Sequence, residues 1–215
     1  MNAREEVLGR IRTALGENRA AVPDVVRDYR LSDGRDPGDP ALLDLLVDRL
    51  EDYRASVLRC SPDEVAATVA RALDAGLGPG WSATDVLAAP GLPDHWRPEG
   101  VGSDDGRAAV ELAQSAASVT GAATAVAETG TLVLDGSPLS GRRALSLLPD
   151  CLVCVVEAAQ VVGSVPEGLA VLDPAAPLTM ISGPSATSDI ELQRVEGVHG
   201  PRTLVVVLVQ VLPAS

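Results

Sequence analysis

The spacing of apolar residues predicts two helices near the beginning of the chain. Within the first 20 residues, apolar side chains recur at helical spacing at Val7, Leu8, Ile11 and Leu15. A polar stretch with several prolines follows over residues 23–40 and is typical of a linker or a long surface loop. A second apolar stripe predicts a helix over residues 41–54. We therefore expect residues 1–54 to form a helical appendage and linker that packs on the rest of the chain or on a second subunit, which leaves a homodimer open.

From residue 55 onward, short apolar segments alternate with amphipathic ones, which predicts strands alternating with helices. The segments with strand-like composition are residues 55–60, 84–89, 123–127, 131–134, 151–156, 178–181 and 203–212. Ser61 and Glu64 form a helix-start signature, Gly76 can end that helix, and a further helix is expected over residues 107–117. Several strands are apolar on both faces, as in sheets covered by helices on each side. The pattern predicts an α/β domain over residues 55–215 with a mainly parallel sheet flanked by helices.

Composition excludes several classes of function. The formal net charge is −13, and every one of the 17 basic residues is arginine, because the chain contains no lysine. Without lysine there is no Schiff base and no phosphate-loop lysine. Aromatic residues make up 2% of the chain, too few for a base-stacking platform, and the negative charge repels a phosphate backbone. We therefore expect no nucleic-acid partner.

The cysteines and the apolar runs indicate a cytoplasmic protein that does not enter a membrane. Three cysteines are too few for a disulfide framework, and the longest apolar runs fall short of the roughly 18 residues that a membrane span needs. The first residues lack the apolar stretch of a signal peptide.

Cys151 and Cys154 have metal-ligand spacing, but positions three apart on a strand face opposite sides, so we interpret both as buried strand residues. The glycine clusters at residues 76–80 and 100–106 lack the strand and helix context of a dinucleotide fingerprint, and we expect Asp104 and Asp105 in a solvated turn.

Glu128 is the first candidate for chemistry, because it is a single carboxylate between two apolar strands. It is followed by Thr129, Gly130 and Thr131. If residues 123–127 form a parallel strand, Glu128 lies at its carboxyl end, where open α/β sheets bind ligands. A partly desolvated carboxylate there would have a raised pKa, which suits a general base or a nucleophile. The alternative is a glutamate in the turn of a hairpin.

A second candidate segment passes from a strand into a loop of small and polar residues. Its candidate ligand-binding residues are Ser182, Gly183, Pro184, Ser185, Thr187, Asp189 and Glu191. A helix is expected after this loop, a layout that points backbone N–H groups at an anion. The two acidic residues disfavour a highly charged phosphate and favour a carboxylate, a monoanion or a neutral polar ligand. The alternative is a helix that Ser188 and Glu191 simply cap.

Three further polar residues could serve a site. His199, framed by glycines before the last strand, is a candidate acid–base group near neutral pH, or else a turn residue. Arg142 or Arg143 could bind a substrate carboxylate in bidentate fashion, although a solvent-facing pair is the more common outcome.

Three stretches of the sequence, taken together, resemble the LUD domain, and within it the lactate-utilisation protein C family. These stretches are Ala-Glu-Thr-Gly-Thr-Leu at residues 127–132, Ser-Gly-Pro-Ser at 182–185 with Thr187, Asp189, Ile190 and Glu191, and Gly-Val-His-Gly-Pro at 197–201. The resemblance covers most of the chain. It implies a fold similar to ribose-5-phosphate isomerase and the coenzyme A transferases. In those transferases a glutamate before a small polar-glycine turn is the nucleophile, and Glu128 is similar in kind.

The resemblance also implies a role in oxidising L-lactate to pyruvate beside iron–sulfur partner proteins. The chain itself shows no cluster-binding cysteine array and no nicotinamide fingerprint, so we expect no cofactor and no metal. Three hypotheses follow: a non-redox component of a lactate-oxidation system that binds a small-molecule ligand, a stand-alone transferase or isomerase-like enzyme that uses Glu128, or a catalytically silent assembly subunit.

Overall fold

The computed structural model describes residues 2–16, 24–187, 195–196 and 200–211, and the chain divides into two compact units, Met1–Arg30 and Leu31–Ser215. In the first unit, helix α1 (Ala3–Leu15) begins at a capping box. The Glu5 N–H donates to the Asn2 side chain at 2.9 Å, and the Asn2 N–H donates to the Glu5 carboxylate at 3.1 Å. The apolar stripe of α1 is exposed within this unit, since Val7, Ile11 and Leu15 each keep about half of their surface. The predicted first helix is therefore present, and the described residues of its own unit do not cover its apolar face.

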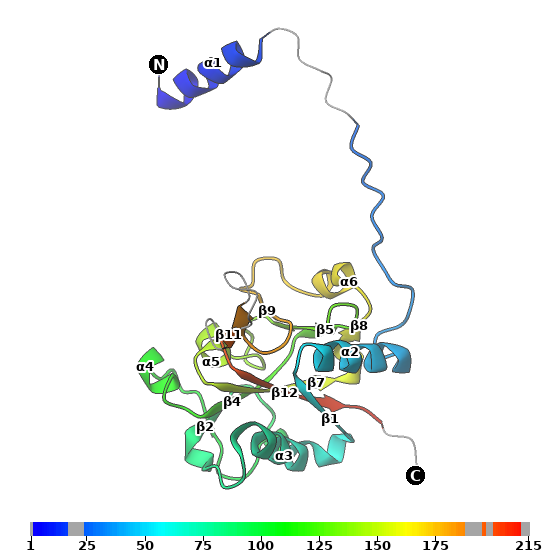
Figure 1. Ribbon diagram of the computed structural model, residues 1–215, viewed down its shortest axis with the longest axis vertical. Helices are drawn as coiled ribbons and strands as arrows, with labels where there is room; N and C mark the ends of the chain where they lie inside the picture. Colours follow the sequence, from blue (N-terminus) through cyan, green and yellow to red (C-terminus); the bar gives the residue numbers. More distant parts are fainter. Residues whose placement is uncertain (1, 17–23, 188–194, 197–199, 212–215) are drawn as a thin grey trace. The chain divides into compact units, whose positions relative to one another are not determined.

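A six-stranded sheet, in which every neighbouring pair is parallel, forms the centre of the second unit (Figure 1). Its strands, in spatial order, are β1 (Ser56–Cys60), β12 (Thr203–Val209), β7 (Cys151–Glu157), β4 (Ala117–Gly121), β2 (Val86–Ala88) and β3 (Gly102–Ser103). The α/β class with a mainly parallel sheet flanked by helices is confirmed. Strand β4, which occupies an inner position, was not among the predicted strands.

Helix α3 (Val65–Leu77) covers one face of this sheet. A 3₁₀ turn, η1 (Pro62–Glu64), precedes it and carries the predicted capping box, in which the Glu64 carboxylate accepts from the Ser61 N–H at 3.2 Å. The helix continues past Gly76 and is capped by Gly78, so the predicted end was wrong. A Cβ at Gly76 would lie 2.5 Å from the Cys151 sulfur, which shows that this glycine allows close packing of helix on strand.

Helix α2 (Pro40–Asp52) and a second sheet cover the opposite face (Figure 1). The second sheet has the order β8 (Val161–Val162), β5 (Thr124–Val126), β6 (Thr131–Leu134) and β9 (Thr179–Ile181). Four leucines of α2 are buried in the core between the layers: Leu42, Leu43, Leu46 and Leu50. Helix α2, which we expected in the appendage, therefore lies in the core of the Leu31–Ser215 unit, and the compact unit begins well before residue 55.

Short elements complete the unit. They are η2 (Ala83–Asp85), η3 (Asp94–Trp96), α4 (Ala109–Leu112), α5 (Arg143–Leu147), η4 (Ala158–Gln160), α6 (Val165–Ala170) and the antiparallel pair β10 (Ala186–Thr187) and β11 (Val195–Glu196). The helix predicted over residues 107–117 is a single turn, because the chain already enters β4 at Ala117. None of the described helices is both long and apolar enough to cross a lipid bilayer.

The cysteine prediction is confirmed. Cys151 lies in the core on the α3 side of the sheet, and Cys154 lies in the core on the α2 side. Burial raises the pKa of each thiol to about 12.

Candidate functional site

Glu128 lies in the turn of a β-hairpin. Strands β5 and β6 pair antiparallel, residues 127–130 connect them, and β5 is parallel only to the short strand β8. The Glu128 N–H donates to the Gly163 carbonyl at 3.1 Å, while the side chain is exposed. The structure therefore shows the hairpin alternative. The expectation that the Glu128 carboxylate is partly desolvated was wrong, because a turn at the end of a sheet faces solvent.

The residues after Glu128 meet the second predicted segment through a row of hydroxyl groups. Thr129 and Thr131 share a hydrogen bond of 2.7 Å between their hydroxyls, and Thr131 and Ser182 share another of 2.8 Å. The contact follows from strand register, since β6 and β9 pair antiparallel with Leu132 opposite Ile181. Thr131 and Ser182, which are 51 residues apart in sequence and belong to two different predicted site segments, thus form one polar surface.

The carboxyl-terminal end of α2 packs against both predicted segments at their glycines. Gly130 has φ +59°, and a Cβ there would lie 2.8 Å from Cβ of Arg49. Gly183 has φ +88°, and a Cβ there would lie 2.7 Å from Cβ of Tyr53. Only glycine fits both the left-handed backbone and this close approach. The contribution of α2 to the site could not be predicted from the sequence, because this contact exists only in the tertiary structure.

The third predicted segment also reaches this place. The Ser185 N–H donates to the Pro201 carbonyl at 2.8 Å, and a Cβ at Gly200 would lie 3.6 Å from Cβ of Ser185. The predicted residues His199, Asp189 and Glu191, and the helix expected after Thr187, lie outside the described residues; Thr187 itself is described only as backbone of β10.

The second and third predicted segments line a cavity of about 290 Å³ that also has walls from both sheets and from α5. Its described lining comprises Arg143, Leu147, Leu152, Leu178, Thr179, Met180, Ile181, Ser182, Gly183, Pro184, Ser185, Gly200, Pro201 and Leu204. We call it the β9 cavity. Among these described residues there is one cation, Arg143, and no anion, in a chain where acidic residues outnumber basic ones by 30 to 17.

A second cavity of about 280 Å³ adjoins the hydroxyl row. Thr129, Thr131 and Ser182 line it together with apolar residues of β5, β6, α6 and β9. Ser182 and Met180 line both cavities, whereas Glu128 lines neither.

An ion pair beside α5 decides which of the two adjacent arginines is available to a ligand. Arg142 donates from Nε and Nη2 to the carboxylate of Asp104, at 2.6 and 2.9 Å, and the Asp104 side chain is 2% exposed. Asp104 also accepts from the Gly106 N–H at 3.1 Å. The Arg142 hydrogen bonds hold the pKa of this buried carboxyl below its usual value. The expectation that Asp104 lies in a solvated turn was therefore wrong, because its side chain is buried. Arg142 and Arg143 are both exposed to solvent, as expected, and of the two only Arg143 lines the β9 cavity.

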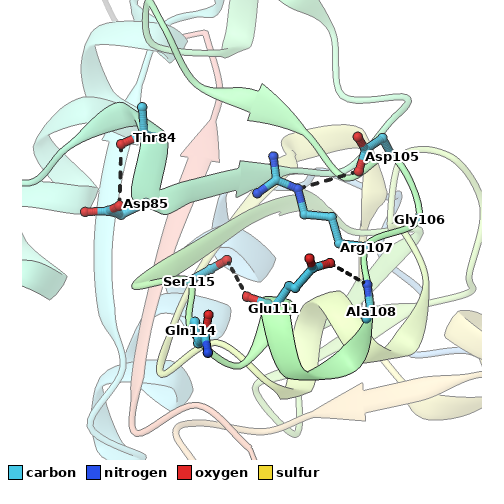
Figure 2. A pocket seen from close by; sticks show the side chains of 9 residues that line it. All are labelled: Thr84, Asp85, Asp105, Gly106, Arg107, Ala108, Glu111, Gln114 and Ser115. Carbon is cyan, nitrogen blue, oxygen red and sulfur yellow. Dashed lines mark hydrogen bonds and ion pairs between the residues drawn. The ribbon is translucent and has the colours of Figure 1, made fainter.

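A third, open and polar cavity of about 710 Å³ lies near the edge strand β3 (Figure 2). Three carboxylates line it, those of Asp85, Asp105 and Glu111, and its arginine, Arg107, lies 3.5 Å from Asp105. Glu111 accepts from the Ala108 N–H at 2.9 Å. The excess of negative charge disfavours an anionic ligand there, and none of the predicted site residues lines this cavity.

The fold and the site define an α/β protein with a small cavity whose described lining is mainly apolar and includes one arginine and several hydroxyls. Comparison with known proteins identifies the family: the LUD domain model matches residues 43–209, and the chain belongs to the LUD domain family. A protein of Deinococcus radiodurans named lactate utilization protein C is 42% identical over 175 residues, which are 78% of this chain and 79% of that protein.

Two further matches agree with this assignment. Lactate utilization protein C 1 of Bacillus mycoides is 32% identical over 117 residues, 50% of this chain and 48% of the relative. The crystal structure of a DUF162 family protein from Deinococcus radiodurans has a TM-score of 0.65 and 34% identity, over 79% of this chain and 97% of that one.

Proposed function

We propose that this chain is a cytoplasmic, non-redox component of a lactate-utilisation system, in which L-lactate is oxidised to pyruvate and iron–sulfur partner proteins carry the electrons. The observation that carries the proposal is the similarity, over most of both chains, to a relative named lactate utilization protein C. The parallel sheet flanked by helices is also compatible with a fold similar to the coenzyme A transferases and ribose-5-phosphate isomerase.

The arrangement of the cysteines supports assigning electron transfer to partner proteins. All three thiols are buried, and Cys151 and Cys154 lie on opposite faces of the sheet, so they cannot converge on one iron–sulfur cluster. Unpaired buried thiols are also typical of a reducing compartment such as the cytoplasm.

Growth on lactate tests the role. We expect deletion of the gene to abolish growth on L-lactate as sole carbon source, to leave growth on glucose intact, and to be reversed by the wild-type gene. Unchanged growth on lactate would contradict the proposal. Affinity purification of the full chain from lactate-grown cells is expected to recover iron–sulfur proteins.

The geometry supports ligand binding better than nucleophilic catalysis by Glu128. The Glu128 side chain is exposed and lines neither cavity of the site. We therefore expect Glu128→Gln to restore growth on lactate as well as the wild type does, with Glu99→Gln as the control at another exposed position. Loss of growth with a folded Glu128→Gln protein would favour the transferase or isomerase-like alternative. The assembly-subunit alternative predicts co-purification with iron–sulfur proteins and no change in that association in Glu128→Gln or His199→Ala.

A further inference from the structure

We infer that the β9 cavity binds a monocarboxylate that has an aliphatic body larger than the methyl group of lactate, with the carboxylate paired to Arg143. This inference rests on the proposed function in one respect: it takes the β9 cavity as the place where the small-molecule ligand binds.

The charge of the cavity wall favours one anionic group. Arg143 is the only charged residue among the described lining residues. Its neighbour Arg142 is held by Asp104, and Arg202, near the same end of the sheet, is held by Asp150 through bonds of 2.7 and 3.0 Å from Nε. Within the described part of the chain, Arg143 has no ion-pair partner of its own. A guanidinium group binds a carboxylate through two parallel hydrogen bonds, and a single arginine matches a single carboxylate.

The apolar part of the wall favours an aliphatic body. Leu152 and Leu204 are buried strand residues at the beginning of β7 and β12, and the half-buried Leu147 and Leu178 line the same cavity. Lactate carries one methyl group, which covers little of a surface built from four leucines. A ligand with more methylene or methyl groups buries more of that surface, and each buried methylene improves affinity by about fourfold, the equivalent of about 0.8 kcal/mol.

Hydroxyl groups in the wall of the same cavity suit a 2-hydroxy or 2-oxo carboxylate. Ser182 and Ser185 line the cavity, and the backbone around Ser185 is fixed by its bond to Pro201. The Ser182 hydroxyl shares its bond with Thr131 and can make a further bond to a ligand oxygen. The carboxylates of the polar cavity near β3, by contrast, repel the same ligands.

The experiment is titration calorimetry of the full chain with a homologous series: lactate, 2-hydroxybutanoate and 2-hydroxy-4-methylpentanoate. We expect Kd to fall by about fourfold for each added carbon, and we expect the neutral amide of the longest acid to lose at least tenfold in affinity. Arg143→Gln is expected to lose at least tenfold for the acids and little for the amide. Arg107→Gln, at the polar cavity near β3, is the matched control and is expected to leave Kd unchanged.

A second variant tests the apolar wall. Leu178→Ala, at a half-buried position, is expected to weaken the dependence of Kd on chain length while it preserves the requirement for a carboxylate. Any one of three results would overturn the inference. Lactate could bind as tightly as the longest acid, the Arg143→Gln variant could bind the acids like the wild type, or none of the acids could bind. The lactate-growth test is independent of these results, so failure of the proposed function and failure of this inference are distinguishable.

Discussion

At the scale of single residues, the Asp104–Arg142 ion pair is the interaction with the clearest energetic consequence. The Asp104 side chain is 2% exposed and accepts hydrogen bonds from Arg142 and from the Gly106 N–H. In Asp104→Asn one of the two acceptor oxygens is replaced by an NH₂ group, so at least one of these buried donors loses its acceptor. We expect a loss of about 1–3 kcal/mol in the free energy of unfolding at pH 7, measured by urea denaturation. Asp105→Asn, at the adjacent exposed carboxylate, is the control and is expected to change stability by less than about 0.5 kcal/mol.

The same ion pair predicts a pH dependence. The pKa of Asp104 is lower in the folded chain, chiefly because of its hydrogen bonds with Arg142. The stabilisation is therefore fully present above the pKa of the unfolded aspartate, about 3.9, and is lost as pH falls through the folded-state value. The stability difference between the wild type and Asp104→Asn should be largest at neutral pH and shrink below about pH 4. A difference that stays constant down to acid pH would contradict this.

Gly183 offers a second residue-scale prediction. A side chain there meets both a left-handed backbone, φ +88°, and the Cβ of Tyr53 at 2.7 Å. We expect Gly183→Ala to cost about 2–4 kcal/mol. Gly34→Ala separates the two effects, because Gly34 has φ +89° with no atom within 4 Å, and it is expected to cost about 1–2 kcal/mol. Equal losses in the two variants would show that the contact between α2 and the loop after β9 is unimportant.

At the scale of elements, the burial of strand β7 in the core determines the reactivity of its two cysteine thiols. A pKa of about 12 leaves on the order of one thiolate in ten thousand at pH 8 for Cys151 and Cys154. We expect an aromatic disulfide reagent to modify none of the three cysteines promptly in the native protein and all three in guanidinium chloride. Val110→Cys, at a position 65% exposed, should add one fast-reacting thiol and validates the assay. Rapid native reaction of the wild type would instead indicate an accessible thiol pair.

Elements whose signals are local were predictable from the sequence, and those set by tertiary pairing were not. The capping box of Ser61 and Glu64 and the apolar runs of β7 and β12 predicted a helix start and two inner strands. Strand β4 was missed because two of its buried side chains, Ser118 and Thr120, are polar and interrupt the apolar run. The site followed the same rule: the residue types around Glu128 and Ser182 marked both segments, but only the pairing of β6 with β9 shows that they meet.

At the scale of the whole molecule, helix α2 determines where the folded unit begins. Its four leucines are each at most 6% exposed and pack against strands of both sheets. Burying one leucine contributes about 1.5–3 kcal/mol, so loss of all four removes a stabilisation comparable to the about 5–15 kcal/mol that keeps an entire domain folded. We therefore expect the fragment 31–215 to unfold cooperatively in urea with nearly the stability of the full chain, and the fragment 55–215 to lack a cooperative transition.

The same two fragments test how α2 contributes to the site. Because the end of α2 packs against Gly130 and Gly183, a chain that lacks it loses support for both loops beside the β9 cavity, whereas a chain that lacks only the first 30 residues keeps that support. Fragment 31–215 should accordingly bind 2-hydroxy-4-methylpentanoate as the full chain does, measured by calorimetry. Full binding by fragment 55–215 would instead make residues 31–54 a dispensable addition to a complete site, and the helix would then belong with the appendage that the sequence pattern predicts.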